Sequence, residues 1–342
     1  MLAGLKREIT IVGGGLAGLS LGVGLLKRGL AVTLVEAGQY PRHRVCGEFI
    51  SGVSDATLDV LGISEAFHDA PRHRRLSWFR QDRKWMSREL PEAAVAISRY
   101  RLDDRLANIF QKQGGKLITA SRRPRRATEG MVWSAGRMPQ KSPWLGLKCH
   151  LVDFPMDDGL EMHLGRGGYV GLTPVEDGRV NLCGLFEVEC GFSGRGRDLM
   201  RQYLQRGGQS ALIERLDAAQ IVESSFSAVA GFQLGWQPVD DGVCCVGDAC
   251  GMIPPFTGNG MSMAFESAEM AIGPLVAWQR GDAAWSDTVA TIHREARRRF
   301  RRRMQAAMTI HRLLLNTHSQ RFLETLAQGK LLPFRPLLSL IR

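Results

Sequence analysis

The chain has 342 residues, of which 45 are lysine or arginine and 34 are aspartate or glutamate, so its formal net charge is +11. With 44% hydrophobic and 23% charged residues, the composition excludes a disordered or collagen-like protein. The length leaves room for about two domains with cores of their own. None of the seven cysteines forms a C-x-x-C pair. We therefore expect neither a disulfide framework nor a metal site, and a reducing cytoplasm as the location.

The first element is an uncharged stretch, residues 9–26, that follows two basic residues and superficially resembles a signal peptide. It contains six glycines and leads through Lys27-Arg28-Gly29 to a second apolar run, residues 31–35, which ends at Glu36. So many glycines are untypical of an export signal or a membrane span. The stretch predicts a strand, a glycine turn and a helix, followed by a second strand.

The glycine turn has the pattern G-x-G-x-x-G between the expected strand and helix. In such a turn the first glycine allows a tight bend, the second lets backbone N–H groups approach a pyrophosphate, and the third lets helix and strand pack closely. The helix N-terminus favours the anion. A carboxylate at the end of the second strand accepts hydrogen bonds from the adenosine ribose. We therefore expect a dinucleotide to contact Gly13, Gly14, Gly15, Leu16, Ala17, Gly18 and Glu36.

A second motif follows a short expected strand at residues 243–246. Gly247-Asp248-Ala249 is followed by P-P-F-T-G-N-G-M at residues 254–261 and by a helix rich in small residues. Together with the glycine turn, this motif resembles the FAD-dependent oxidoreductases related to p-hydroxybenzoate hydroxylase and, more closely, to geranylgeranyl reductase. The resemblance implies non-covalent FAD, with Asp248 on the ribitol and a helix N-terminus at the flavin pyrimidine edge. The residues that it assigns to FAD here are Gly247, Asp248, Pro255, Gly258, Asn259, Gly260 and Met261.

Two other segments resemble the same family. Residues 99–106, R-Y-R-L-D-D-R-L, are similar to its R-x-x-L-D-x-x-L helix, in which the arginine lies near the FAD phosphates. For Arg99, a surface arginine on an amphipathic helix is the alternative. Residues 42–48, R-H-R-V-C-G-E, are similar to its Lys-x-Cys-Gly-Glu/Asp stretch, in which the cysteine lies beside the flavin on the substrate side.

The resemblance therefore places Arg42, Arg44, Cys46 and Gly47 at the cofactor, and it makes Cys46 a candidate catalytic residue. Basic neighbours lower the pKa of a thiol, so we expect a lowered pKa for Cys46. A small buried hydrophobic residue is the alternative interpretation of a single cysteine.

Short alternating runs predict an antiparallel sheet from residues 144–151, 160–164, 169–175 and 179–186, with the last two joined by a hairpin. In the family such a sheet forms the substrate domain. Tyr169 and Pro174 match its Tyr-x-Trp-x-Phe-Pro segment, which makes Tyr169 the second candidate catalytic residue. Gly171 and Thr173 replace the two aromatic residues that line an isoprenoid channel in the family. The identity of the substrate therefore stays open.

Towards the C-terminus, apolar residues recur every three or four positions between Val289 and Met308, which predicts an amphipathic helix. Its outer face is basic between His293 and Met304. A solvated helix face is the ordinary interpretation of such a run. The functional interpretation is peripheral contact of this helix with the inner face of an anionic membrane. Aromatic interleaving is lacking, so we do not expect a nucleic-acid partner.

The predicted fold is α/β, with three parts. Residues 1–60, 95–143 and 238–280 form a Rossmann-like FAD-binding domain, residues 61–94 and 144–237 a substrate domain with an antiparallel sheet, and residues 281–342 a C-terminal helical region. The FAD domain is shorter than in the family, because V-W-S-A-G-R at residues 132–137, which corresponds to its Ala-Asp-Gly element, comes soon after Gly115. This segment also lacks the aspartate of that element.

The predicted function is that of an FAD-dependent oxidoreductase. We expect a reductase or dehydrogenase that acts on an apolar, lipid-, isoprenoid- or polyketide-like molecule by flavin hydride transfer. The alternatives are a monooxygenase that uses NAD(P)H and O2, and a flavin-binding protein without turnover. A second G-x-G-x-x-G is lacking, so NADPH or NADH would bind transiently on the flavin face. The oligomeric state stays open.

Overall fold

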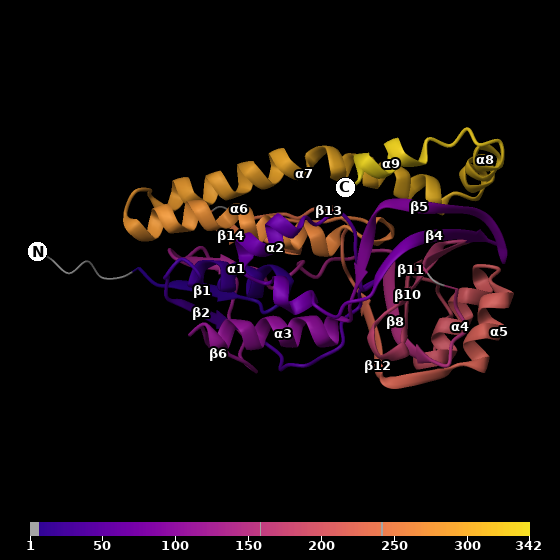
Figure 1. Cartoon of the computed structure of the whole chain (residues 1–342), viewed down its shortest axis with the longest axis horizontal. Coiled ribbons are helices and arrows are strands. Elements are labelled where there is room, and N and C mark those ends of the chain that lie inside the picture. The colour runs from indigo at the N-terminus through magenta and orange to yellow at the C-terminus, as the bar shows by residue number, and fades with distance from the viewer. Residues whose placement is uncertain (1–6, 158, 241) are drawn as a thin grey trace, which may run out of the picture.

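The computed structural model describes residues 7–157, 159–240 and 242–342, so the first six residues of the predicted FAD domain lie outside it. A parallel sheet with its helices lies beside an antiparallel sheet, and the C-terminal helices run along one side of both (Figure 1). The predicted fold class is therefore confirmed. Of the helices described, none is long and apolar enough to cross a membrane.

The parallel sheet has the strand order β14-β7-β1-β2-β6. Its strands are β1 (Ile9–Val12), β2 (Val32–Val35), β6 (Lys116–Ile118), β7 (Met131–Trp133) and β14 (Cys244–Cys245). All neighbouring pairs are parallel. Three long helices share one core with this sheet, namely α1 (Leu16–Leu26), α3 (Arg99–Lys112) and α6 (Gly260–Arg280), and α6 packs mainly against α1.

The glycines of α1 let these helices approach one another. A Cβ atom at Gly22 would lie 2.7 Å from the ring of Phe110 on α3. A Cβ atom at Gly24 would lie 2.7 Å from the side chain of Ile272 on α6. The glycine-rich stretch is therefore a buried helix that packs against both neighbours.

The antiparallel sheet has the order β12-β8-β11-β10-β9-β4-β5-β3, in which only the β4–β9 pair is parallel. Its strands are β3 (Phe49–Ile50), β4 (Arg72–Arg80), β5 (Arg83–Ala96), β8 (Trp144–Val152), β9 (Leu160–Gly165), β10 (Gly168–Pro174), β11 (Val180–Glu187) and β12 (Gln220–Ala230). The predicted strands and the hairpin between β10 and β11 are confirmed. Asp177 and Gly178 adopt positive φ of 60° and 66° in that hairpin, which favours glycine and aspartate.

The two faces of this sheet have different partners, because side chains alternate along each strand. On one face, Leu147, Cys149 and Leu151 of β8 pack in a core with the helices α4 (Gly196–Arg206) and α5 (Ser210–Ala218). The opposite, inner face faces the FAD domain and the C-terminal helices. Its apolar part joins Tyr169 and Leu185 to the residues of those helices in a second core.

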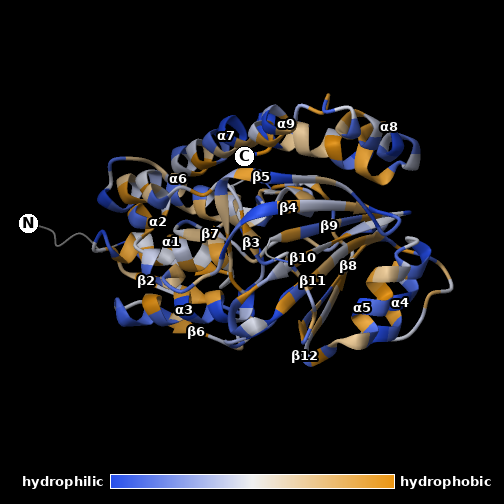
Figure 2. Ribbon diagram, turned by 45° about the vertical axis from the view of Figure 1, so that its right-hand side comes forward, coloured by the Kyte–Doolittle hydropathy of each residue, from blue (hydrophilic) through white to orange (hydrophobic). Residues whose placement is uncertain are grey.

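The C-terminal helices form one layer. They are α7 (Trp285–Leu315), α8 (Thr317–Gln328) and α9 (Phe334–Leu340). The predicted amphipathic helix is confirmed within α7, where Val289, Ile292, Ala296, Phe300 and Met304 are buried. Figure 2 shows α7 mainly in the blue of hydrophilic residues, because much of its surface faces solvent.

One predicted domain boundary is wrong. The helix α2 (Asp55–Leu61) and the 3-10 turn η1 (Ser64–Phe67) pack in the core of the FAD domain. The change to the antiparallel sheet comes where β4 begins, at Arg72. The sequence predicts this domain boundary at residue 61, because α2 and η1 are too short to give a clear periodic pattern of apolar residues.

Five short elements remain in the described part of the chain, most of them in or next to the second predicted motif. They are β13 (Gly235–Trp236), β15 (Gly251–Met252) and the 3-10 turns η2 (Glu176–Gly178), η3 (Gly247–Ala249) and η4 (Pro255–Thr257), of which η2 lies in the β10–β11 hairpin. The turns η3 and η4 lead from β14 to the N-terminus of α6.

Candidate active site

Four loops from distant parts of the sequence meet at one edge of the parallel sheet. Gly13 follows β1, Glu36 follows β2, Ser134 follows β7 and Gly247 closely follows β14. The carboxyl ends of parallel strands share one edge, and a crevice forms there where the connections on either side of a strand diverge. By this rule a dinucleotide is expected beside the carboxyl end of β1, and we call this region and the loops around it the groove.

The glycine turn has the close approaches that the sequence predicts. Gly13 has a φ of +110°, and a Cβ atom there would overlap the backbone of Ala135. A Cβ atom at Gly18 would overlap the carbonyl oxygen of Gly13, so helix α1 can approach the turn only with glycine at this position. Gly15 is the N-cap of α1 and offers no side chain to cap the first N–H groups. These groups can donate to a pyrophosphate.

Glu36 is a buried, charged acceptor at the end of β2. Its Oε2 accepts a hydrogen bond from Gly14 N at 2.6 Å, and its Oε1 accepts from Gly38 N at 2.8 Å and Arg42 Nη2 at 2.7 Å. Burial disfavours the charged carboxylate, but the backbone N–H groups and the guanidinium groups of Arg44 and Arg42 outweigh it and lower the pKa of Glu36. A carboxylate has about four acceptor sites, so Oε2 can also accept from a ribose hydroxyl.

Arg99 lies beside the glycine turn, with its Nη2 atom 3.9 Å from the position of a Cβ on Gly15. Asp103, which is fully buried, accepts from Arg99 Nε at 2.6 Å and from Arg44 Nε at 2.9 Å. Burial disfavours the cation, but Asp103 raises the pKa of Arg99 above its ordinary value. Arg99 is only 13% exposed, so the alternative of a surface arginine is wrong.

Asp248 presents a free carboxylate on η3. Among the described residues it has no hydrogen-bond or ion-pair partner, although it is half-buried. Burial raises its pKa, and the guanidinium groups of Arg137 and Arg99 oppose this rise. A half-buried acceptor without a protein partner fits the ribitol hydroxyl groups of FAD.

The turn before α6 is only partly open to the groove. Pro255 and Gly260 are half-buried, whereas Gly258 is covered by the ring of Phe49 and has a φ of +65°. Asn259 is completely buried, and its side-chain amide has no partner in the described structure. The Asn259 side chain is therefore enclosed by the protein, and Pro255 and Gly260 are the accessible part of the turn.

Cys46 is held against the antiparallel sheet by its backbone. Its carbonyl oxygen accepts from Asn181 Nδ2 at 2.9 Å, and that of Gly47 accepts from Thr173 Oγ1 at 3.0 Å. The predicted lowered pKa of the thiol is wrong, because burial raises it and the opposing effect of Arg99 is smaller. Arg44, which the sequence places next to the thiol, turns instead towards Asp103.

Tyr169 lies in the wall behind the groove. Its side chain is 3% exposed, its hydroxyl is 3.4 Å from His311 Nδ1 on α7, and its ring meets that of Phe256 edge to face. Burial raises the pKa of Tyr169 well above its ordinary value, so the phenol is neutral. Its catalytic role stays a prediction.

Sequence reasoning missed several charged residues at the site. Asp103 and Arg137 stand within recognised motifs but were given no role. Lys148 and His150 point to the inner face of β8, although both are fully buried. Their alternation with Leu147, Cys149 and Leu151 was the available signal, because charged residues on one face of a buried strand require partners there.

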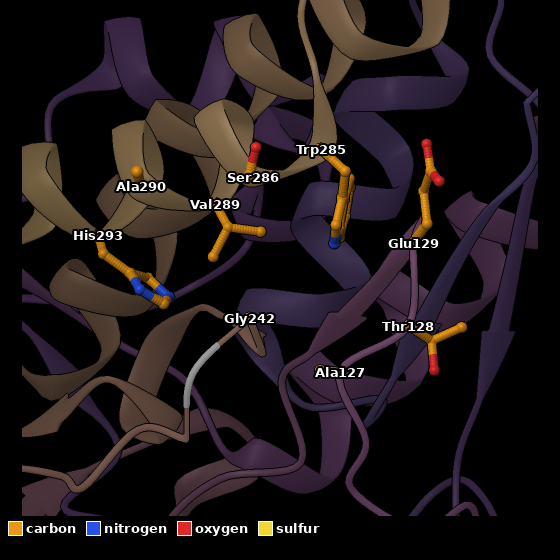
Figure 3. A pocket seen from close by; sticks show the side chains of 9 residues that line it. All are labelled: Ala127, Thr128, Glu129, Gly242, Trp285, Ser286, Val289, Ala290 and His293. Carbon is orange, nitrogen blue, oxygen red and sulfur yellow. The ribbon is translucent and has the colours of Figure 1, made fainter.

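A hollow of about 410 Å³ lies elsewhere, at the amino ends of β7 and β14 (Figure 3). Thr128 and Glu129 precede β7, Gly242 precedes β14, and Trp285 and His293 come from α7. The carboxyl ends of the same strands lead to Ser134 and to the turn that carries Asp248. The hollow is therefore on the opposite edge of the sheet from the groove.

The fold and the groove define a class of protein. The glycine turn, the buried Glu36, the Arg99 beside it and the free Asp248 fit FAD, and they stand on a parallel sheet joined to an antiparallel sheet. The model for "FAD binding domain" matches residues 6–122. The N-terminal third of the chain is therefore similar to an FAD-binding domain, and the site residues fit a flavoprotein.

Solved structures share this fold over nearly the whole chain. The flavin-dependent brominase Bmp2 matches with a TM-score of 0.79 and 16% identity, covering 98% of this chain and 93% of its own. A geranylgeranyl bacteriochlorophyll reductase-like protein from Thermoplasma acidophilum has a TM-score of 0.74 and 17% identity, covering 98% and 95%. PqsL, a probable FAD-dependent monooxygenase from Pseudomonas aeruginosa, has a TM-score of 0.71 and 17% identity, covering 92% and 98%.

Among curated proteins, the chain is similar to menaquinone reductases. That of Mycolicibacterium smegmatis is 28% identical over 121 residues, which cover 34% of this chain and 30% of that protein. That of Mycobacterium tuberculosis is 26% identical over the same length and the same shares. The chain thus matches less than a third of the length of these relatives.

Proposed function

We propose that this FAD-dependent oxidoreductase is a reductase or dehydrogenase that transfers hydride between the flavin and an apolar small molecule. The observation that carries the proposal is a loosely packed position on the inner face of the antiparallel sheet, opposite the Cys46 loop. Gly171 and Cys183 are cross-strand partners there, and both are half-buried. A Cβ atom at Gly171 would meet nothing closer than 3.8 Å.

The residues on the two sides of this position, along β10 and β11, differ in polarity. Thr173 and Asn181, the next partners along β10 and β11, are polar and fix the Cys46 loop. In the other direction, Tyr169 and Leu185 are buried in an apolar core. A molecule with a reducible group near Cys46 and an apolar remainder would match this polarity. Such a molecule is lipid-, isoprenoid- or polyketide-like in character.

The residues of the groove have different roles in the proposed reaction. Glu36, Arg99 and Asp248 bind and orient FAD, which supplies two-electron hydride chemistry when it is bound. Burial keeps Cys46 a neutral thiol on the substrate side, where it can donate a hydrogen bond or a proton. NADPH or NADH would donate electrons after transient binding. The name of the mycobacterial relatives, menaquinone reductase, supports a reductase over a monooxygenase.

The test is reduction of the purified protein with NADPH or NADH without oxygen, followed by rapid mixing with either a short-chain menaquinone analogue or oxygen. We expect the apolar acceptor to reoxidise the flavin, and oxygen to do so without an absorbing intermediate. A monooxygenase protects such an intermediate in a dry site. An accumulating intermediate together with ¹⁸O in a product would establish the monooxygenase instead. If no donor reduces the flavin and no acceptor reoxidises it, the protein binds flavin without turnover.

A further inference from the structure

The C-terminal helical layer carries most of the net charge of the chain. Residues 285–342 contain twelve lysine or arginine residues and three acidic residues, a formal charge of +9 out of the +11 of the whole chain. In Figure 1 this layer extends along one side of the molecule, over the FAD domain and the antiparallel sheet. The charge is therefore concentrated on one surface.

Part of the basic run is used internally, which corrects the predicted basic outer face of α7. Arg303 is buried and pairs with Glu266 of α6 at 2.7 Å, and Arg299 pairs with the same carboxylate at 2.9 Å. Arg298 pairs with Glu295 at 2.5 Å. A buried carboxylate on a neighbouring helix, far away in sequence, could not be foreseen from the run itself.

Arg342 is half-buried and donates a hydrogen bond to Ser51, whereas the other eight cations of the layer are exposed. Within the described structure, no carboxylate lies within 4.0 Å of Arg294, Arg297, Arg301, Arg302, Arg312, Arg321, Lys330 or Arg335. The only acidic residue of α8, Glu324, pairs with Arg80 of β4. The outer surface of the layer thus has cations without counter-charges.

Exposed apolar side chains occur on the same layer. Seven large hydrophobic residues are exposed in the described structure, and four of them are here, namely Leu313 (40%), Phe322 (63%), Leu331 (72%) and Leu340 (52%). Isolated exposed apolar residues need no explanation. Their concentration in the last thirty residues or so, among free cations, is typical of a surface that contacts the lipid headgroup and acyl boundary.

We propose that the outer surface of α7, α8 and α9 docks on an anionic lipid bilayer. Each free cation near an anionic bilayer surface contributes about 1 kcal/mol, and the exposed phenylalanine and leucine side chains bury apolar area at its boundary. Nucleic acid is the other polyanion, but exposed aliphatic side chains gain nothing from a phosphate backbone. The bilayer is therefore the better match.

The inner side of the same layer packs against the antiparallel sheet near the groove. Leu338 and Ile341, at the end of the chain, and Leu314 share one apolar core with Tyr169 of the antiparallel sheet. The layer thus lies between the docked bilayer and the apolar wall behind the groove. On the proposed function, the enzyme would take up its apolar substrate from the membrane. The docking itself does not depend on that function.

The experiment is co-sedimentation of the FAD-loaded protein with phosphatidylcholine vesicles that either lack or contain phosphatidylglycerol, at low and high salt. We expect binding to the anionic vesicles only, and loss of binding as salt rises. The triple variant R301E/R302E/R312E should bind at least about tenfold more weakly. The control R122E/R123E/R126E has the same change of net charge on an exposed loop outside the layer, and it should bind like the unmodified protein.

A second variant tests the apolar contribution. F322S/L331S leaves every charge in place, and it should weaken vesicle binding while leaving binding to duplex DNA unchanged. Equal losses in both charge-reversal variants, recovery of the unmodified protein in the supernatant with anionic vesicles, or no effect of F322S/L331S would each overturn the proposal. Bound FAD, read from the visible spectrum, confirms the fold of each variant. No turnover is needed, so failure of the proposed reaction would be seen separately.

Discussion

Glu48 and Lys148 form an ion pair of 3.2 Å in which both side chains are completely buried. Glu48 also accepts hydrogen bonds from Arg99 N at 3.0 Å and pairs with His150 Nε2 at 2.6 Å. The carboxylate therefore ties strand β8 of the antiparallel sheet to the N-terminus of α3 in the FAD domain. Since Glu48 follows Cys46 and Gly47 directly, the pair also fixes the loop that carries Cys46.

Lys148→Met should destabilise the protein strongly, because it leaves the buried Glu48 carboxylate without its ammonium partner. Breaking a buried pair in this way costs about 3–5 kcal/mol. The double variant E48Q/K148M should be less unstable than K148M, because no uncompensated charge remains. Urea unfolding measures both, and Lys84→Met, at an exposed position of β5, is the control. A loss for K148M no larger than that for K84M would contradict the structural role of the pair.

Acid should weaken the packing of α7 against the antiparallel sheet through His311. Burial lowers the pKa of His311 to about 4, whereas the unfolded chain titrates near the ordinary value of about 6.5. Between these values the unfolded state binds the proton and the folded state does not, so stability falls as the pH decreases.

The size of this effect follows from the same shift. From pH 7 to pH 5, His311 should cost the folded state about 1–2 kcal/mol. His311→Gln removes the titrating group, so the decrease in unfolding free energy over this range should be smaller in the variant. Burial also lowers the pKa of His43 to about 4, and this contribution remains in both proteins. Identical pH dependence in the two proteins would show that His311 does not carry the effect.

Asp248→Ala should weaken FAD binding, because the ribitol hydroxyl groups lose a half-buried acceptor. Hydrogen bonds to a charged group contribute about 1.5–3 kcal/mol, which corresponds to roughly a tenfold to hundredfold rise in the dissociation constant. Asp240→Ala removes a carboxylate that is 75% exposed and lies before β14, and it serves as the control. Fluorescence titration of the apoprotein with FAD gives both constants. Unchanged affinity in D248A would remove Asp248 from the cofactor site.

Features encoded in a few consecutive residues could be predicted from the sequence. The glycine turn and the Glu-Asp-Gly hairpin depend on local backbone conformations that glycine permits, so their position and form were foreseeable. The side-chain chemistry of the site depends on distant partners. Arg303 pairs with Glu266 of another helix, and the pKa of Cys46 follows the burial of the thiol more than the arginines next to it in sequence.

Cys46→Ser should leave FAD content nearly unchanged and lower turnover if the thiol lies on the substrate side, as we propose, because the backbone contact of Cys46 with Asn181 is kept in the variant. Since burial raises the pKa of Cys46, its alkylation by iodoacetamide should be slow at neutral pH and should accelerate only in alkaline solution. Cys190 is exposed, so Cys190→Ser gives the matched control and should remove the rapidly alkylated thiol. Mass spectrometry of the labelled peptides separates the two sites. Rapid labelling of Cys46 at neutral pH would show an accessible thiolate, and normal turnover in C46S with altered thermal stability alone would reduce Cys46 to a packing residue.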